Sequence, residues 1–251
     1  MTQTAAVPAT VRAAARAVDA VKVHGTGEAS VRALDGVSVD FESGRFTAIM
    51  GPSGSGKSTL LHCIAGLDRL TSGEAYIGDV ELGRLKDKPL TLLRREQVGF
   101  IFQSYNLVPT LSAADNITLP LRIAGRSVDR AAYDDVVGIT GLGARLEHRP
   151  SELSGGQQQR VAAARALMSR PAIVFADEPT GNLDSKAGAE LLGFLRDAVD
   201  RSQQTIVMVT HDPLAAARAD RVVFLADGKV VQDHRGPTAD SILEVMRHLG
   251  E

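Results

Sequence analysis

The stretch GPSGSGKST at residues 51–59 decides the fold of this 251-residue chain. It has the form GxxxxGK[ST], in which backbone N–H groups surround a phosphate chain, Lys57 reaches the terminal phosphates and the Ser58 hydroxyl binds Mg²⁺. The apolar run at 46–51 predicts a buried strand, and STLLHCIAGL at 58–67 predicts a helix. Such a strand–loop–helix unit places phosphate at a helix N-terminus. The expected nucleotide contacts here are Gly51, Pro52, Ser53, Gly54, Ser55, Gly56, Lys57, Ser58 and Thr59.

A second glycine-rich stretch, LSGGQQQR at 153–160, lies about a hundred residues further on. Ser154 is a suitable N-cap for a helix that extends to Met168 and is ended by Pro171. A capped helix with a glycine-rich entry is the simpler interpretation. However, a helix N-terminus with free amides and a hydroxyl also binds phosphate. A chain with one complete phosphate loop needs a second surface only if that surface serves a neighbouring molecule.

The motif LSGGQ resembles the signature of the ATP-binding cassette (ABC) ATPases, and the resemblance extends from about residue 18 to about residue 233. It implies an α/β fold: a P-loop NTPase (RecA-like) core, an antiparallel β subdomain and an inserted helical subdomain. It also implies a homodimer of two cassettes, head to tail, in which the signature of one subunit covers the ATP of the other. The signature residues are Leu153, Ser154, Gly155, Gly156 and Gln157.

Three apolar runs end in polar residues, as buried parallel strands do when their carboxyl ends enter a site. IVFADEP at 173–179 ends in Asp177 and Glu178, TIVMVTH ends in His211, and VGFIFQ ends in Gln103. Any one of these could be ordinary strand-end polarity, and His211 alone could be satisfied by backbone. Their coincidence favours one site at the edge that also carries the phosphate loop.

The resemblance assigns a role to each of these side chains. Asp177, the Walker B aspartate, should hold Mg²⁺ together with Ser58. Glu178 should orient or deprotonate the attacking water, and His211 should sense the γ-phosphate and hold Glu178. Gln103 should contact both metal and water. These are the parts that phosphoryl transfer to water requires.

Two further positions follow from the resemblance, each with an alternative. The D-loop residues Asn182, Leu183 and Asp184 should cross to the partner subunit, although Asp184 or Ser185 would equally serve as a helix N-cap. The family stacks adenine on an aromatic residue, usually tyrosine, and His24 stands at that position. An imidazole offers less stacking area. His24 is therefore expected to contact ATP, the alternative being an ordinary loop residue.

Composition limits the remaining possibilities. The chain has 28 Lys and Arg against 30 Asp and Glu, for a net charge of −2, which does not suit a nucleic-acid binder. Its single cysteine, Cys63, excludes an intrachain disulfide and is expected in the core. No stretch has the roughly 18 consecutive apolar residues that cross a bilayer. A membrane connection must therefore go through a partner.

The expected organisation is a single ABC ATPase domain at 18–251, after a flexible Ala-rich tail at 1–17 that lacks the features of a signal peptide. The core and β subdomain take about 18–103 and 162–235, the helical subdomain about 104–161, and a terminal helix about 237–249.

Longer phrases such as HRPSELSGGQQQRVAAARAL resemble the ATPase subunits of the lipoprotein-release, macrolide-efflux and cell-division group. This implies an ATPase at the cytoplasmic face of the plasma membrane that drives a separate permease, by export, extraction or mechanical signalling. Alternatives are an ABC ATPase that regulates a membrane complex without transport, and a non-transport ABC ATPase of DNA repair or translation. A P-loop kinase would leave the signature unexplained.

The loop SYNLVPTL after Gln103 carries apolar residues at the junction of core and helical subdomain. We expect Tyr105, Leu107 and Pro109 to line a groove for a short cytoplasmic helix of the permease, as apolar anchors do in interfaces. The alternative is that they plug the junction.

Overall fold

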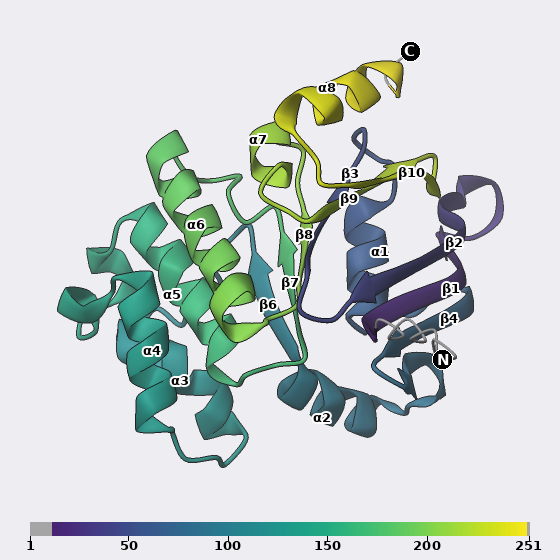
Figure 1. Cartoon of the computed structure of the whole chain (residues 1–251). Coiled ribbons are helices and arrows are strands. Elements are labelled where there is room, and N and C mark those ends of the chain that lie inside the picture. Colours follow the sequence, from purple (N-terminus) through teal and green to yellow (C-terminus); the bar gives the residue numbers. More distant parts are fainter. Residues whose placement is uncertain (1–11, 250–251) are drawn as a thin grey trace, which may run out of the picture.

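The strand expected before the phosphate loop lies inside a six-stranded sheet of order β10-β9-β3-β8-β7-β6 (Figure 1). In this computed structural model, which describes residues 12–249, the phosphate-loop strand and its neighbours are parallel, and only the last strand pairs antiparallel. Parallel strands bring their carboxyl ends to one edge. The strands are β3 (Phe46–Met50), β6 (Val98–Phe102), β7 (Ile173–Asp177), β8 (Ile206–Val209), β9 (Arg221–Ala226) and β10 (Lys229–Arg235).

Helices cover both faces of this sheet, which explains why its parallel strands are largely apolar on both sides. Ile49 points into the cluster formed with α1, whereas Ala48 and Met50 point into the cluster on the other face. The second face is covered by four helices. The helices concerned are α1 (Lys57–Ile64) on the first face, and α5 (Gly155–Met168), α6 (Ser185–Ser202), α7 (Pro213–Ala216) and α8 (Ala239–His248) on the second.

A second, antiparallel sheet packs on the far side of α1, and its first strand shows that the expected tail at 1–17 is too long. Its first strand begins at Ala13, so residues 13–17 are not part of a flexible tail; residues 1–11 lie outside the described part of the chain. Ala14, Ala15 and Ala17 are buried, because small side chains fit where this strand meets the core. The strands are β1 (Ala13–His24), β2 (Val31–Glu42), β4 (Ser72–Ile77) and β5 (Val80–Glu81).

The helical segment has a hydrophobic cluster of its own, formed by α3 (Ala113–Ile123), α4 (Arg130–Thr140) and one face of α5. The expected boundary at residue 161 is wrong, because α5 passes through it without a break. Val161 and Ala164 face the helical cluster, while Ala163 faces the sheet. With 3.6 residues per turn, one apolar helix can serve two cores.

The remaining elements complete the frame of the site. A hairpin turn at residues 227–228 joins β9 to β10, and both Asp227 and Gly228 have positive φ, as a tight hairpin turn requires. The expected terminal helix is α8. The helix α2 (Asp87–Gln97) was not predicted and precedes β6. No helix within residues 12–249 is both long and apolar enough to cross a membrane.

Candidate active site

The phosphate loop connects β3 to α1 and is held against its neighbours by backbone contacts. Gly51 has a φ of +148°, and a Cβ there would lie 1.9 Å from the carbonyl oxygen of Leu225. Gly56, at φ +98°, precedes α1, and a Cβ there would lie 2.3 Å from the carbonyl oxygen of Ala33. Only glycine fits at these two positions. The loop therefore keeps one shape and presents the N-terminus of α1.

Lys57 folds back over this loop. Its Nζ donates to the carbonyl oxygens of Gly51, at 3.0 Å, and Pro52, at 2.7 Å. Burial lowers the pKa of Lys57 from its ordinary value, and the nearby charges of Glu178 and Asp177 oppose this shift. The ammonium group therefore lies over the loop, where its hydrogen-bond acceptors are neutral carbonyl oxygens. A charged phosphate oxygen is a stronger acceptor and can replace them.

Oxygen ligands suited to Mg²⁺ meet at the start of α1. The Ser58 hydroxyl donates to Asp177 Oδ1 at 2.9 Å, although the two residues are 119 positions apart in the chain. The other carboxylate oxygen of Asp177 lies 3.2 Å from Nε2 of His62. Hard oxygen donors are what Mg²⁺ prefers, so this pair fits that ion. His62 was not predicted, although its i+4 spacing from Ser58 puts both on one helix face.

Glu178 follows Asp177 at the edge of the sheet in an uncommon backbone conformation. Its φ is +47°, in the left-handed region, which non-glycine residues rarely adopt outside turns and functional sites. One carboxylate oxygen, Oε1, lies 3.0 Å from Nδ1 of His211. The other, Oε2, is buried and lacks a hydrogen-bond partner among the described residues. A free acceptor beside the phosphate loop fits a water molecule to be oriented there.

The side chain of Gln103 points toward the D-loop. Its Nε2 lies 3.4 Å from Oδ1 of Asn182, and Nδ2 of Asn182 donates to the Gln103 carbonyl at 3.1 Å. A Cβ on Gly181 would lie 2.9 Å from Gln103 Nε2. The described hydrogen bonds of Gln103 therefore go to the D-loop and not to Ser58 or Asp177, and its contact with metal stays a prediction.

The signature motif caps α5 and leaves its serine exposed. Ser154 Oγ accepts from the N–H of Gln157 at 3.3 Å, and Gln157 Oε1 accepts from the N–H of Ser154 at 2.9 Å. This reciprocal pair is a capping box. Leu153 is buried, and Gly155 and Gly156 lie close to the Tyr105 hydroxyl and the Ala187 side chain. The helix cap is thus present, and its outward face is open to a second molecule.

Asp184 caps α6 by accepting from the N–H of Ala187 at 2.8 Å, so the helix-cap interpretation of Asp184 is confirmed. Asn182 is exposed and Leu183 is half-buried. His24 is the last residue of β1 and is exposed. Partner contact by the D-loop and adenine stacking by His24 both stay predictions.

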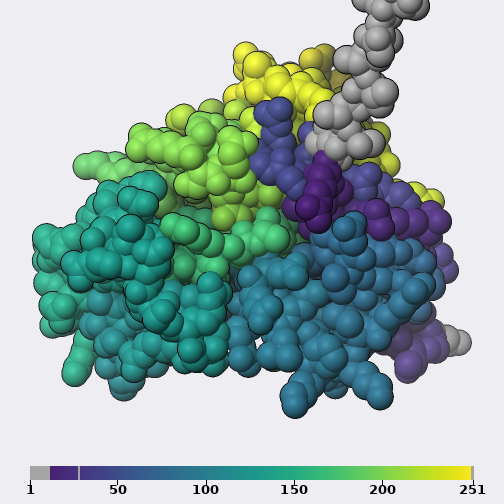
Figure 2. Space-filling view, turned by 60° about the horizontal axis from the view of Figure 1, so that its bottom comes forward, coloured from purple at the N-terminus to yellow at the C-terminus, as the bar shows by residue number. Residues whose placement is uncertain are grey.

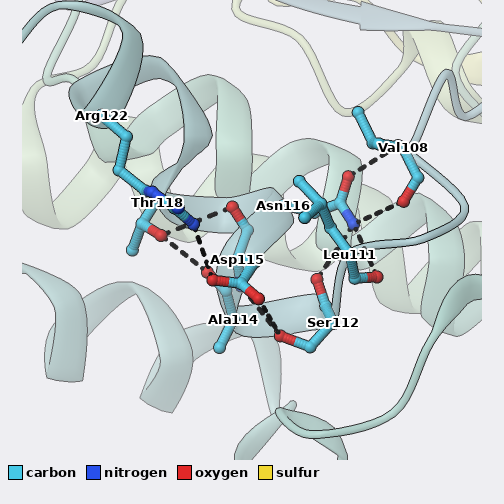
Figure 3. Close-up of polar contacts among 8 residues, drawn as sticks. All are labelled: Val108, Leu111, Ser112, Ala114, Asp115, Asn116, Thr118 and Arg122. Carbon is cyan, nitrogen blue, oxygen red and sulfur yellow. Dashed lines mark hydrogen bonds and ion pairs between the residues drawn. The ribbon is translucent and has the colours of Figure 1, made fainter.

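The loop after Gln103 is held by hydrogen bonds to a buried asparagine of α3, Asn116 (Figure 3). Asn116 has no exposed surface; its Oδ1 accepts from Val108 N–H at 2.8 Å, and its Nδ2 donates to three carbonyls of residues 108–112. Leu107 packs half-buried on the helical cluster, Tyr105 is half-buried and Pro109 is exposed. Leu107 therefore packs on the helical segment, and the permease contact of Tyr105, Leu107 and Pro109 stays a prediction.

An apolar groove of about 540 Å³ lies beside this loop, between α2, β6 and α3. Figure 2 looks onto the side of the molecule where the blue part, which contains α2, and the teal helical part meet. Ile123 and Leu67 in this groove are 62% and 46% exposed. None of its lining residues is acidic. The lining includes Leu67, Phe100, Phe102, Pro120 and Ile123, with three arginines, Arg94, Arg95 and Arg165.

Comparison with known proteins agrees with this geometry. The profile of the ABC transporter family matches residues 34–181. The chain is 45% identical over 220 residues to the bacitracin export ATP-binding protein BceA of Halalkalibacterium halodurans, covering 86% of each. It is 46% identical over 217 residues to the macrolide export ATP-binding/permease protein MacB of Hyphomonas neptunium, covering 86% of this chain. The chain spans only 34% of the length of that relative.

Solved structures give the same result. The dimeric structure of MJ0796, a bacterial ABC transporter cassette, superposes with a TM-score of 0.81 at 40% identity, covering 89% of this chain and 99% of the other. A dimeric post-hydrolysis state of MJ0796 bound to ADP and Pi superposes with a TM-score of 0.80 at 39% identity, with the same coverage. The fold predicted from the motifs is thereby confirmed. The chain belongs to the ABC transporter family and is an ATP-hydrolysing cassette of that family.

Proposed function

We propose that this cassette hydrolyses ATP to drive a separate membrane permease, to which it binds at the cytoplasmic face of the plasma membrane. One observation carries the catalytic part of this proposal. Lys57, Ser58, Asp177, Glu178 and His211, from three separate segments, meet at one edge of the sheet within hydrogen-bond or charge contact of one another. Every function that phosphoryl transfer to water requires has a side chain there.

The roles follow from the contacts. Ser58 and Asp177 would hold Mg²⁺, which when bound neutralises charge on the β- and γ-phosphates. Lys57 adds a positive charge on the loop side. Glu178 accepts a hydrogen bond from the attacking water through its unpartnered Oε2, while His211 holds the other carboxylate oxygen. His211 thus fixes the direction in which Glu178 can act.

A second copy completes the site. Ser154 is exposed, the first residues of α5 are half-buried, and the described hydrogen bonds of Ser154 and Gln157 stay within their own segment. MJ0796 is dimeric in both solved structures. In the proposed homodimer the exposed signature of one subunit covers the ATP bound at residues 51–59 of the other, with the D-loop at the contact. ATP is then required for a stable dimer.

The apolar groove beside the Gln103 loop is the proposed permease contact. Its occupant is a short amphipathic helix of the permease with acidic residues, because three arginines and no carboxylate line the groove. The names of the MacB and BceA relatives, which refer to export, favour export as the direction of transport. Tyr105, Leu107 and Pro109, which were expected to line a groove for this helix, are not among the residues that line this one. They would support it from the adjoining loop, which also carries Gln103.

The catalytic proposal is tested with Glu178→Gln. This change removes the charge that accepts the water proton and also the repulsion between the carboxylate and the γ-phosphate. Steady-state hydrolysis should fall at least a hundredfold, while the variant forms a stable dimer with Mg-ATP in gel filtration. Glu147→Gln, an exposed change in the helical segment, serves as the matched control. Near-normal hydrolysis in Glu178→Gln would defeat the assignment.

The docking proposal is tested with Ile123→Asp. Because Ile123 is 62% exposed, the substitution should leave folding and basal hydrolysis unchanged. It should abolish recovery of a membrane protein with the tagged cassette from detergent-solubilised membranes of its own host. Val231→Asp, on β10 and 48% exposed, is the control outside the groove. Equal recovery with both variants would place the permease elsewhere.

A further inference from the structure

Gln159, on the signature helix α5, is a buried polar side chain that the proposed chemistry does not use. It has no exposed surface. Its Nε2 donates to the carbonyl oxygen of Phe102 at 3.0 Å and to that of Pro179 at 2.7 Å. Phe102 immediately precedes Gln103, and Pro179 immediately follows Glu178. A single amide thus joins the signature helix to the two loops that carry those residues.

The orientation of this amide is determined by its two acceptors. If the amide oxygen faced the two carbonyls it would repel both, so the NH₂ group must point toward them. The oxygen, Oε1, is buried and has no hydrogen-bond partner among the described residues. An apolar side chain of similar length would fill the space without an unpaired acceptor. Packing alone therefore does not account for glutamine here.

A second side chain of the same helix holds the next part of the loop. Arg165 donates to the carbonyl oxygens of Asn106, at 2.6 Å, and Tyr105, at 3.1 Å. The end of β6 and the loop after it are thus attached to α5 at three carbonyls, those of Phe102, Tyr105 and Asn106. In contrast, the side chain of Gln103 is exposed and contacts Asn182. The helix holds the loop by its backbone and leaves the Gln103 side chain available for the site.

We propose that Gln159 is a positioning residue that couples the signature motif to the catalytic loops of its own subunit. Ser154 and Gln159 are five residues apart on one helix, about 7.5 Å along its axis, so they move together. A displacement of the Gln103 or Glu178 loop is passed through Gln159 to Ser154. The inference rests on the proposed function, in which Ser154 contacts the nucleotide of the second subunit. Through Gln159, the position of the catalytic loops in one site would affect how Ser154 of the same subunit closes over the nucleotide in the second site.

The test replaces the amide and measures more than stability. Gln159→Met keeps the length of the side chain and removes the two donated hydrogen bonds. The matched control is Gln158→Met, the same change one residue earlier, where the amide donates only to the Leu153 carbonyl. For Gln159→Met, kcat should fall at least tenfold while KM for ATP stays within twofold, since the phosphate loop is unchanged. Gln158→Met should keep a kcat within twofold of wild type.

A second readout does not depend on turnover. In the Glu178→Gln background, Gln159→Met should raise the dissociation constant of the Mg-ATP dimer about tenfold, measured by sedimentation, and Gln158→Met should not. Gln159 is merely a core residue if Gln159→Met lowers the melting temperature but leaves kcat and the dimer constant unchanged. Should that variant not fold, Gln159→Asn, which retains polarity but cannot reach both carbonyls, should show the same kcat loss.

The remaining outcomes distinguish the coupling role of Gln159 from the proposed chemistry at Glu178. Failure of both Gln159→Met and Gln159→Asn to fold would assign Gln159 to the core and overturn the inference. If Glu178→Gln abolishes hydrolysis while Gln159→Met retains wild-type kcat, only the coupling fails. If Glu178→Gln itself retains hydrolysis, the proposed chemistry fails first.

Discussion

Gly51 and Gly54 offer a matched pair of substitutions within the phosphate loop. An alanine Cβ at position 51 would lie 1.9 Å from the Leu225 carbonyl oxygen, so β9 or the loop must move by roughly 1 Å, whereas nothing lies within 4 Å of a Cβ at Gly54. Both residues have positive φ, which costs a non-glycine residue about 1–2 kcal/mol. The forced displacement adds about 1–3 kcal/mol, as overpacking does. Gly51→Ala should therefore lower the free energy of unfolding by about 3 kcal/mol, and Gly54→Ala by about 1 kcal/mol.

Urea unfolding followed by circular dichroism measures this difference, since the chain contains no tryptophan for fluorescence. Isothermal titration with Mg-ATP measures the second consequence. Displacing the loop misaligns the amides that surround phosphate, so Gly51→Ala should weaken ATP binding at least tenfold, or about 1.4 kcal/mol. Gly54→Ala should lose less in both assays. Equal losses for the two variants would show that loop flexibility, and not the contact with β9, is what glycine provides.

Three further outcomes are expected. Asn116→Ala should lower the free energy of unfolding by about 2–3 kcal/mol in urea, because it removes four hydrogen bonds of a fully buried side chain and leaves the Val108 N–H without its acceptor, although the Val108 carbonyl keeps its bond from the Leu111 N–H. Asp233→Asn should lower the free energy of unfolding by about 1 kcal/mol at neutral pH, a value reduced because the Asp233 side chain is partly exposed. Hydrogen bonds from Arg221 lower the pKa of Asp233 in the folded state. The advantage of the wild type is therefore present above about pH 4 and disappears as the pH falls through the folded-state pKa. Ser154→Arg should leave Mg-ATP binding by the monomer within twofold in titration calorimetry and abolish hydrolysis; a parallel loss of binding would argue against a site shared between subunits.

The elements with strong local patterns were predictable from sequence. The run at 46–51, the phosphate loop and the following helix are β3, the loop and α1, because a fully apolar strand before a glycine-rich loop has few other folds. The polar ends of β6, β7 and β8 meet at one edge because those strands are parallel. The family match at 34–181 covers β3, the phosphate loop, α1, β6 and β7, but not β8.

The errors came from residues whose pattern is weak. Ala14, Ala15 and Ala17 were assigned to a tail because alanine is common in both flexible and buried segments, and only the packing of β1 against β2 and α1 distinguishes them. The helix α2 was missed because Pro89, in its first turn, reads equally as a loop residue. The boundary at 161 failed because one helix serves two cores.

Side chains that act across the fold were beyond sequence reasoning. His62 reaches Asp177 over 115 positions, and Gln159 reaches Phe102 and Pro179 over 57 and 20 positions. Each is a polar residue on a largely apolar helix, where periodicity predicts only which face is turned inward. For Gln159 the useful signal is that the residue is both buried and polar, because a buried amide must have a partner. Its partner appears only when the strands are assembled.

The pair Glu178 and His211 shows why the site should require closure. Glu178 Oε2 is buried, yet the side chain of His211 is 74% exposed, so the hydrogen bond that directs Glu178 competes with water on one side. A second subunit covering this edge would remove that water and lower the local dielectric, which strengthens the bond between the two side chains. Glu178 already holds its strained φ of +47° without the partner. The Glu178 carboxylate is therefore already positioned in the isolated cassette. In the proposed dimer, closure would exclude water from the Glu178–His211 hydrogen bond, so that His211 can hold Glu178 toward the attacking water.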